Sequence, residues 1–426
     1  MGKASEMRIG LLLQADRTDG GVYQYSLSVV DALAKSDPSY QYTVINPGRD
    51  ASKVCEGIDT VSPPRDGFPF GVLRRLYVES LKLLPVPVPL LIPFSLTTLG
   101  RWHRREHTGN GMGLDLMVCT VPTAAARHMK VPYVMVIHDL MHRYQTAERH
   151  PWKERVFRDS VYRQGAHHSV LTVVSSEWSK RDLHKFYGIP LDKIRVVPEF
   201  VPPYVREYQG LTDSEMDLIL RRFNLPGRYV IYPAQFWRHK NHINLVKALY
   251  RIKREYQAEV PAVFVGAPKE AFREVMSLIE SLGLSGQITY LGYVSDKEVV
   301  ALYKRALALV MPSSLNVSSI PVIEAMTLGT CCLCSNIAPL PEQVGDAGLL
   351  FDPSDETDIA EKVWRVWNDE SLRHDLSARG TVRAKERHTA EVFAQRWQGV
   401  VREAINICGD RGKELPVTRT LSEANR

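Results

Sequence analysis

The stretch from 312 to 353 constrains the fold of this chain more than any other part of its sequence. An apolar run at 306–311 predicts a strand, which leads into a polar loop and then into a helix at 321–329. Proline suits the first positions of a helix and glycine suits the left-handed turn after it, while Ser318 or Ser319 could cap unpaired N–H groups. This order of strand, loop and helix predicts one unit of a parallel α/β sheet.

Ligands of parallel α/β sheets bind at the carboxyl ends of the strands. There the first turn of a helix presents unpaired N–H donors and a partial positive charge, so we expect an anion beside Ser319 and Ile320. Glu324 lies one turn into the predicted helix and is placed to accept two hydrogen bonds from a vicinal diol such as a ribose.

The same stretch resembles the donor-site signature of the retaining glycosyltransferases of family 4 (glycosyltransferase group 1), which have the GT-B fold. The residues in register with that signature are Pro312, Ser313, Pro321, Glu324, Ala325, Met326, Gly329, Ser335, Leu340, Pro341, Glu342, Gly345, Asp346, Ala347, Gly348, Asp352 and Pro353. The resemblance extends over about 7–405 and is most specific in the second half of the chain.

The loop before the predicted helix departs from the family pattern. Asn316 stands where the family has the first of two paired glutamates, and Val317 and Ser319 stand where it has glycines. In the family the first glutamate contacts the transferred sugar and the second contacts the nucleotide ribose. The resemblance therefore implies that Glu324 binds the ribose, while Asn316 can hydrogen-bond a sugar hydroxyl but carries no charge.

A cluster of cations precedes the first helix of the second half of the chain. Arg238 and Lys240 lie just before a helix predicted from about Ile243, with Asn241 as its cap, so fixed positive charge and a helix N-terminus meet there. A solvated basic loop is the alternative. The resemblance implies that Lys240 is the family's phosphate-binding lysine, and that Arg238 replaces the arginine whose position holds Gln235.

Three further contacts are implied in the same way. Gly20 and Gly21 form a glycine turn before a helix, where the family meets the donor phosphates; an ordinary tight turn is the alternative. His138 ends a predicted strand, as in the family's strand ending in HDL, and is expected to contact the sugar or the leaving phosphate. The turn holding Tyr293 and Val294 is expected to contact the nucleobase through its backbone.

Composition limits the class of protein. With 44% hydrophobic and 24% charged residues, the 426-residue chain is typical of a globular protein of two to three domains. Its net charge of +6 is too small and dispersed to predict nucleic-acid binding. The six cysteines lack a pair of CxxC motifs, and three of them share one short apolar strand, so we expect no metal site and a reducing cytoplasm. No cofactor is expected.

The apolar run near the N-terminus is too short for a signal peptide, so none is expected, and four prolines in the apolar run at 83–99 argue against a transmembrane helix there. The segment 71–105 has six Arg/Lys against one acid, interleaved with leucines, which fits peripheral contact with an anionic membrane. Leucines buried in the N-terminal domain with a solvated arginine rim are the alternative. The expected location is the cytoplasm, with peripheral binding to the inner face of the cell membrane.

These observations predict an α/β protein of GT-B architecture, with two Rossmann-like parallel-sheet domains facing across a cleft. The predicted parts are an N-terminal acceptor-side domain at 1–205, a hinge at 206–224, a nucleotide-sugar domain at 225–385, a crossover helix at 386–408 and a disordered tail at 409–426.

The implied activity is transfer of a hexose, with retention, from a nucleoside-diphosphate sugar to a glycan or lipid-linked acceptor, in bacterial surface-polysaccharide assembly. His138, Asn316 and Lys240 are the candidate catalytic residues. Asn316 also favours an alternative, a catalytically weak or inactive member that only binds sugar nucleotides. A nucleotide-sugar epimerase or a glycogen-type synthase on the same fold is the other alternative.

Overall fold

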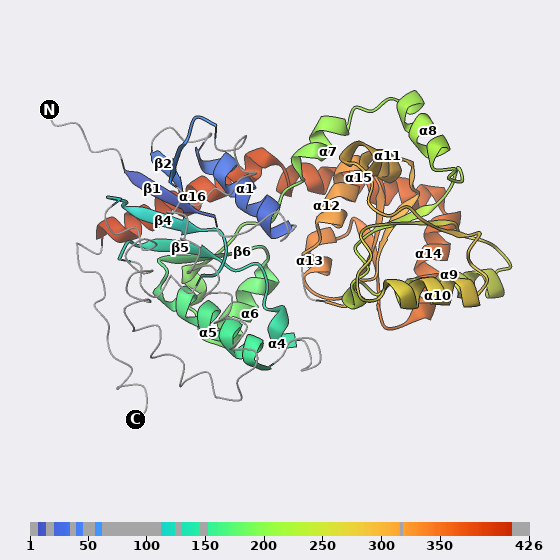
Figure 1. Cartoon of the computed structure of the whole chain (residues 1–426), viewed down its shortest axis with the longest axis horizontal. Coiled ribbons are helices and arrows are strands. Elements are labelled where there is room, and N and C mark those ends of the chain that lie inside the picture. Colours follow the sequence, from blue (N-terminus) through green and yellow to red (C-terminus); the bar gives the residue numbers. More distant parts are fainter. Residues whose placement is uncertain are drawn as a thin grey trace, which may run out of the picture. The chain divides into compact units, whose positions relative to one another are not determined.

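The computed structural model describes residues 7–13, 21–34, 40–45, 56–61, 112–123, 130–144, 152–315 and 318–410. The chain divides into two compact units (Figure 1). Unit 1 comprises residues 1–174, 180–197 and 394–426, and unit 2 comprises residues 175–179 and 198–393.

Unit 1 contains a parallel sheet with strand order β3-β2-β1-β4-β5-β6-β7. Its strands are β1 (Arg8–Leu12), β2 (Gln41–Ile45), β3 (Asp59–Val61), β4 (Leu116–Cys119), β5 (Tyr133–Val136), β6 (Leu171–Val174) and β7 (Ile194–Val196). Its helices are α1 (Gly21–Ala34), α4 (Met141–Tyr144), α5 (Trp152–His168), most of α6 (Glu177–Tyr187) and most of α16 (Ala390–Asp410). Every residue of β4, β5 and β6 is buried, because helices cover both faces of the sheet (Figure 1).

Unit 2 contains a second parallel sheet, with order β10-β9-β8-β11-β12-β13. Its strands are β8 (Val230–Pro233), β9 (Ala262–Val265), β10 (Ile288–Tyr290), β11 (Ala308–Met311), β12 (Cys331–Ser335) and β13 (Gly348–Phe351). Its helices are α7 (Pro203–Tyr208), α8 (Asp213–Arg222), α9 (His242–Glu255), α10 (Phe272–Ser281), α11 (Asp296–Arg305), α12 (Ile320–Leu328), α13 (Leu340–Val344), α14 (Glu356–Asn368) and α15 (Glu370–Arg387).

Both sheets have the doubly wound order of a Rossmann fold, in which the first strand lies inside the sheet and the direction of winding reverses beside it. In unit 2 this reversal falls between β8 and β11, which pair directly. A ligand of such a sheet binds where the loops after these two strands diverge. These are the loops that hold Lys240 and Ser319.

The segment 206–224, predicted as a hinge, is helical and belongs to unit 2. Thr212 and Glu215 form a capping box at the start of α8, a local signal that the hinge prediction overlooked. Met216 is buried in a cluster with Val205 of α7 and Val300 of α11. The segment is therefore packed against the core of unit 2.

The C-terminal helix differs slightly from its prediction. Helix α16 begins at Ala390 and extends to Asp410, so residues 409 and 410, predicted to be disordered, are helical. The rest of the predicted tail lies outside the described residues, as do Gly20, Asn316 and the basic segment 71–105.

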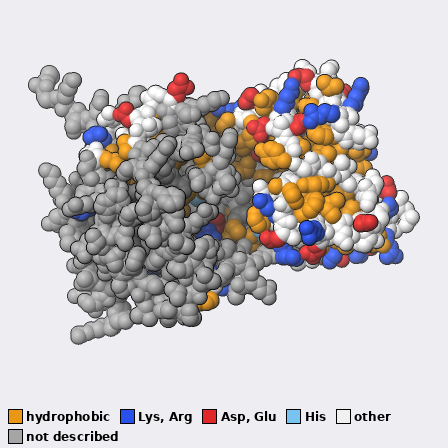
Figure 2. All heavy atoms as spheres, viewed as in Figure 1, with side chains coloured by type: hydrophobic (Ala, Val, Ile, Leu, Met, Phe, Trp, Pro, Cys, Tyr) orange, Lys and Arg blue, Asp and Glu red, His pale blue; other side chains and the backbone are white. Residues whose placement is uncertain are grey.

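The described part of the chain contains no helix that is both long and apolar enough to span a membrane. On the face of unit 2 seen in Figure 2, acidic and basic side chains are interspersed. Cys331, Cys332 and Cys334 lie buried on β12 as free thiols, as predicted. No cluster of His, Cys, Asp and Glu suited to a metal ion occurs among the residues described.

The packing of α8 gives a first prediction. Met216→Ala removes a buried side chain and should lower the free energy of unfolding by about 2–3 kcal/mol. Leu218→Ala on the same helix is the matched control, because Leu218 is 72% exposed and its loss should change little. Chemical denaturation followed by circular dichroism measures both; equal small effects would mean that 206–224 behaves as a linker.

Candidate functional site

Lys240 lies in the loop that follows β8, at the end of a short 3₁₀ turn. Its side chain is half-buried, and no carboxylate within the described ranges forms an ion pair with it. Burial lowers the pKa of its ammonium group to about 8. A poorly hydrated cation without a counter-ion is stabilised when an anion binds beside it.

The loop is held against the one that follows β11. The side-chain amide of Asn241 donates to the carbonyl of Pro312 at 3.0 Å and to that of Pro353 at 2.7 Å. Asn241 is the N-cap residue of α9, as predicted, although its side chain makes no capping hydrogen bond. The backbone N–H of Ser314 also donates to the carbonyl of His239 at 2.9 Å. The loops holding Lys240 and Ser319 are thus joined at the winding reversal.

Arg238 faces a different neighbour. Its guanidinium pairs with the Glu274 carboxylate of α10 at 2.8 Å, and its backbone N–H donates to Glu270 at 3.1 Å. Gln235, which stands where the family has an arginine, accepts a hydrogen bond from the Trp237 indole at 2.8 Å. Arg238 would have to leave Glu274 to bind a phosphate, so its role as the replacement arginine stays a prediction.

Glu324 is buried in the second turn of α12, and both of its carboxylate oxygens accept hydrogen bonds. The Tyr303 hydroxyl donates at 2.7 Å, and the Tyr204 hydroxyl of α7 donates to the other oxygen. Burial raises the pKa of Glu324 despite these two donors. The sequence did not predict either tyrosine, and Tyr204 was placed in the N-terminal domain at 1–205. Ribose binding by Glu324 stays a prediction.

The start of α12 is organised by a glutamine rather than by serine caps. The side chain of Gln343 accepts from the N–H of Ser319 and donates to its carbonyl, each at 2.9 Å. The Ser319 hydroxyl is buried and has no hydrogen-bond partner in the described structure, while the Ser318 hydroxyl bonds that of Ser175 at 3.0 Å. Ser319 is therefore the N-cap residue of α12, as one of the two predicted alternatives, but its hydroxyl makes no capping hydrogen bond. Gly329 ends the helix with φ of 73°, as predicted.

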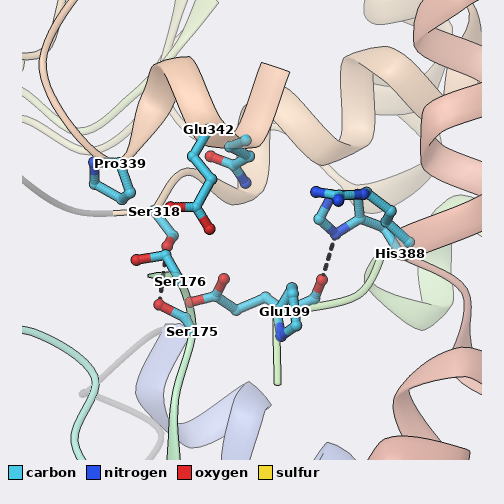
Figure 3. Close-up of a pocket in the computed structure, with 10 residues that line it drawn as sticks. Ser175, Ser176, Glu199, Ser318, Pro339, Glu342 and His388 are labelled. Carbon is cyan, nitrogen blue, oxygen red and sulfur yellow. Dashed lines mark hydrogen bonds between the residues drawn. The ribbon is translucent and has the colours of Figure 1, made fainter. Parts of the chain in front are cut away.

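A small cavity of unit 2 opens beside this helix start (Figure 3). Its lining residues are Ser175, Ser176, Pro198, Glu199, Ser318, Pro339, Glu342, Gln343, Arg387 and His388. Both carboxylate oxygens of Glu342 accept backbone N–H groups at the start of α6, at 2.7 and 2.9 Å. Burial raises the pKa of Glu199 to about 6. No motif in the sequence analysis marks Glu199 as a site residue.

In unit 1, His138 follows β5, and its Nε2 lies 2.9 Å from the carbonyl of Thr120. Burial lowers the pKa of the imidazole, so the ring is neutral at pH 7 and Nε2 is the donor to that carbonyl. Nδ1 is then an acceptor, suited to a hydroxyl hydrogen. Asp139 accepts the N–H of Met141 at 2.9 Å and so orders the start of α4.

The remaining predicted contacts are only partly described. Helix α1 begins at Gly21. Tyr293 is 84% exposed and Val294 is buried, in a turn where the carbonyl of Gly292 accepts from Gly266 at 2.8 Å. The structure brings Lys240, Ser319 and Ile320 to one edge of the unit 2 sheet through the joined loops.

Comparisons with known proteins agree with this architecture. A family model described as glycosyl transferases group 1 matches residues 221–383, and one described as glycosyltransferase family 4 matches residues 19–204. The O-antigen chain mannosyltransferase B of Escherichia coli is 29% identical over 275 residues, covering 64% of this chain and 69% of that protein. The serotype-specific mannosyltransferase WbdA of Escherichia coli is 31% identical over 159 residues, covering 37% of this chain and 20% of that longer protein.

Two solved structures show the same fold. Sucrose-phosphate synthase from Thermosynechococcus elongatus superposes with a TM-score of 0.69 at 18% identity, covering 94% of this chain and 100% of that one. HepE of Anabaena, in complex with UDP and glucose, gives a TM-score of 0.68 at 16% identity, covering 93% and 100%.

The bond from Tyr303 to Glu324 gives a second prediction. Tyr303→Phe removes a donor to a buried carboxyl and should lower the free energy of unfolding by about 1.5–3 kcal/mol. Tyr256→Phe is the control, because its ring is partly exposed and stacks on Trp364 without a comparable buried bond. Thermal and urea unfolding measure both variants, and an undiminished stability of Tyr303→Phe would contradict the assigned bond.

Proposed function

The chain belongs to the group 1 glycosyltransferases of the GT-B fold, and on that basis we propose that it transfers mannose from a nucleoside-diphosphate sugar to a glycan or lipid-linked acceptor, with retention. Mannose is the hexose we favour because the relatives include O-antigen chain mannosyltransferases of Escherichia coli and Salmonella typhimurium. Assembly of a surface polysaccharide is the corresponding setting, with peripheral membrane contact through 71–105.

The observation that supports the proposal most is the environment of Lys240. Its ammonium group is half-buried, lacks a carboxylate partner in the described ranges, and lies at the winding reversal of the unit 2 sheet. A diphosphate would supply the missing negative charge. Charge that develops on the leaving diphosphate is stabilised by a cation already fixed in place, since no solvent has to reorganise during the reaction.

In the proposed reaction, the bond between the anomeric carbon and the diphosphate oxygen breaks, and the acceptor hydroxyl oxygen bonds to the same face of that carbon. The acceptor proton passes to the departing phosphate oxygen. Lys240 and the N–H group of Ile320 at the start of α12 hold the phosphates, without a metal cofactor, and Glu324 holds the ribose. His138 of unit 1 accepts a sugar hydroxyl hydrogen through Nδ1.

A second candidate is a member that binds sugar nucleotides without efficient transfer, favoured by the neutral Asn316. Incubation with GDP-mannose or UDP-glucose and a lipid-linked acceptor distinguishes the two. The proposal predicts a glycosylated acceptor whose new linkage has the anomeric configuration of the donor, as measured by NMR. An inverted linkage would refute retention. Nucleotide binding without product would favour the second candidate, and a changed free sugar nucleotide would indicate an epimerase.

Loss of the Lys240 charge should weaken donor binding. We expect Lys240→Ala to reduce the affinity for a nucleoside diphosphate by about 1–3 kcal/mol, or about 5- to 150-fold, through a lost charge-assisted bond. Lys362→Ala is the control, since Lys362 pairs with Asp358 on the outer helix α14. Isothermal titration with GDP and UDP measures both, and equal affinities for the two variants would remove Lys240 from the site.

The lowered pKa of Lys240 also predicts a pH dependence. As the pH rises through about 8, the ammonium group loses its proton and nucleoside-diphosphate affinity should fall, by up to about tenfold per pH unit. The neighbouring His242 has a pKa lowered to about 3 by burial and stays neutral throughout this range. Lys240→Arg should flatten the dependence between pH 8 and 9.5, because a guanidinium stays protonated. Parallel pH profiles for wild type and variant would contradict the assignment.

A further inference from the structure

Hydrogen bonds fix the backbone at Glu199. Its own carbonyl accepts a hydrogen bond from Nδ1 of His388 at 2.6 Å, and the carbonyl of His388 accepts the N–H of Val201 at 2.9 Å. These two bonds hold the chain just after Pro198. Figure 3 shows the Glu199 side chain extended away from His388 and toward the serines at 175 and 176.

The groups beside the carboxyl are neutral. The hydroxyls of Ser318 and Ser175, which lie 3.0 Å from each other, and the backbone of Glu199 itself partly offset the rise that burial causes in the pKa of the carboxyl. The charged or titratable neighbours that line the cavity are Arg387, His388 and Glu342. None of them forms an ion pair with Glu199 in the described structure, and Glu342 is occupied by the start of α6. An ionisable group kept in a cavity without a counter-ion lowers stability, which is typical of a functional residue.

The place of this carboxyl relates it to the proposed reaction. Ser318 directly precedes Ser319, the N-cap of α12, and follows the loop position of Asn316, where the chain lacks a carboxylate. Ser318 therefore connects the Glu199 side chain to the start of α12. Glu342, the other glutamate of the cavity, instead accepts backbone N–H groups at the start of α6. Two serine hydroxyls beside a carboxylate form a site suited to sugar hydroxyls, which both donate and accept hydrogen bonds.

We propose that Glu199 is the carboxylate that contacts the transferred sugar, accepting a hydrogen bond from one of its hydroxyls beside the start of α12. This inference rests on the proposed function, which it deepens by naming a residue of the sugar subsite. Ser318 and Ser175 position the carboxylate. Asn316 contributes no charge, so the negative charge of the subsite comes from a different part of the chain.

The first test separates sugar binding from diphosphate binding. Affinities of wild type and Glu199→Gln for GDP-mannose and GDP, and for UDP-glucose and UDP, are measured by titration calorimetry at pH 7.5. Glu199→Gln should bind the diphosphates within twofold of wild type and lose at least fivefold in affinity for the preferred sugar nucleotide. Glu361→Gln, an exposed glutamate of α14, is the control and should match wild type. Equal losses for sugar nucleotide and diphosphate, or no loss at all, overturn the proposal.

The second test uses pH. Because the pKa of Glu199 is raised to about 6, wild-type turnover should fall as the pH decreases through 6, and Glu199→Gln should be at least tenfold slower at pH 7.5 without that acid limb. Its melting temperature should exceed that of wild type at pH 7.5, because an ionised carboxyl buried without a cation destabilises the folded state. The difference should shrink toward pH 5, where the native carboxyl is protonated. A lower melting temperature at pH 7.5 with unchanged turnover indicates a purely structural residue and overturns the proposal.

The two proposals can fail separately. If wild type binds a sugar nucleotide but transfers nothing to any acceptor, the proposed function fails, and the affinity difference between sugar nucleotide and diphosphate still decides the role of Glu199. If wild type transfers mannose and Glu199→Gln does so at the same rate, only the assignment of Glu199 fails. If wild type binds none of the four nucleotides, both proposals fail.

Discussion

A half-buried ammonium group, which no carboxylate of the described residues pairs with, is the feature on which the proposed donor site depends. Lys240 sits where the winding of the unit 2 sheet reverses, and burial lowers its pKa to about 8. Arg238, two residues earlier, is already neutralised by Glu274. An anion is therefore expected to bind more favourably beside Lys240 than beside Arg238, because the Lys240 charge is neither well hydrated nor paired with a described carboxylate. The loops around Lys240 are in turn fixed by Asn241, which joins the ends of two strands.

Two carboxyl groups of unit 2, those of Glu324 and Glu199, have different surroundings. Glu324 is bonded on both oxygens by tyrosine hydroxyls from α7 and α11, which fix its position. Glu199 lies in a cavity beside two serine hydroxyls, and burial raises its pKa to about 6. Rigid placement suits a residue that holds an unreacting part of a ligand, whereas a titratable carboxylate suits the reacting part. Both lie within unit 2, so this division of roles does not depend on unit 1.

The sequence predicted the helix ends and the order of strands and helices, because these depend on neighbouring residues. The helix after β11 and its end at Gly329 followed from proline and glycine alone, and the two Rossmann-like sheets followed from repeated strand–helix order and the family resemblance. The side-chain partners could not be predicted, because they join distant segments: Tyr204 with Glu324, Gln343 with Ser319, and Asn241 with Pro353. The hinge prediction failed because polar, proline-flanked residues were judged by composition, although the Thr212 capping box was readable.

The most direct measurement is a crystal structure of the protein with a bound nucleoside diphosphate. The account predicts a phosphate oxygen within about 3 Å of the Lys240 Nζ, the distance of a charge-assisted hydrogen bond, at the loops that follow β8 and β11. A diphosphate bound at another surface, with Lys240 still lacking an anion beside it, would contradict the account.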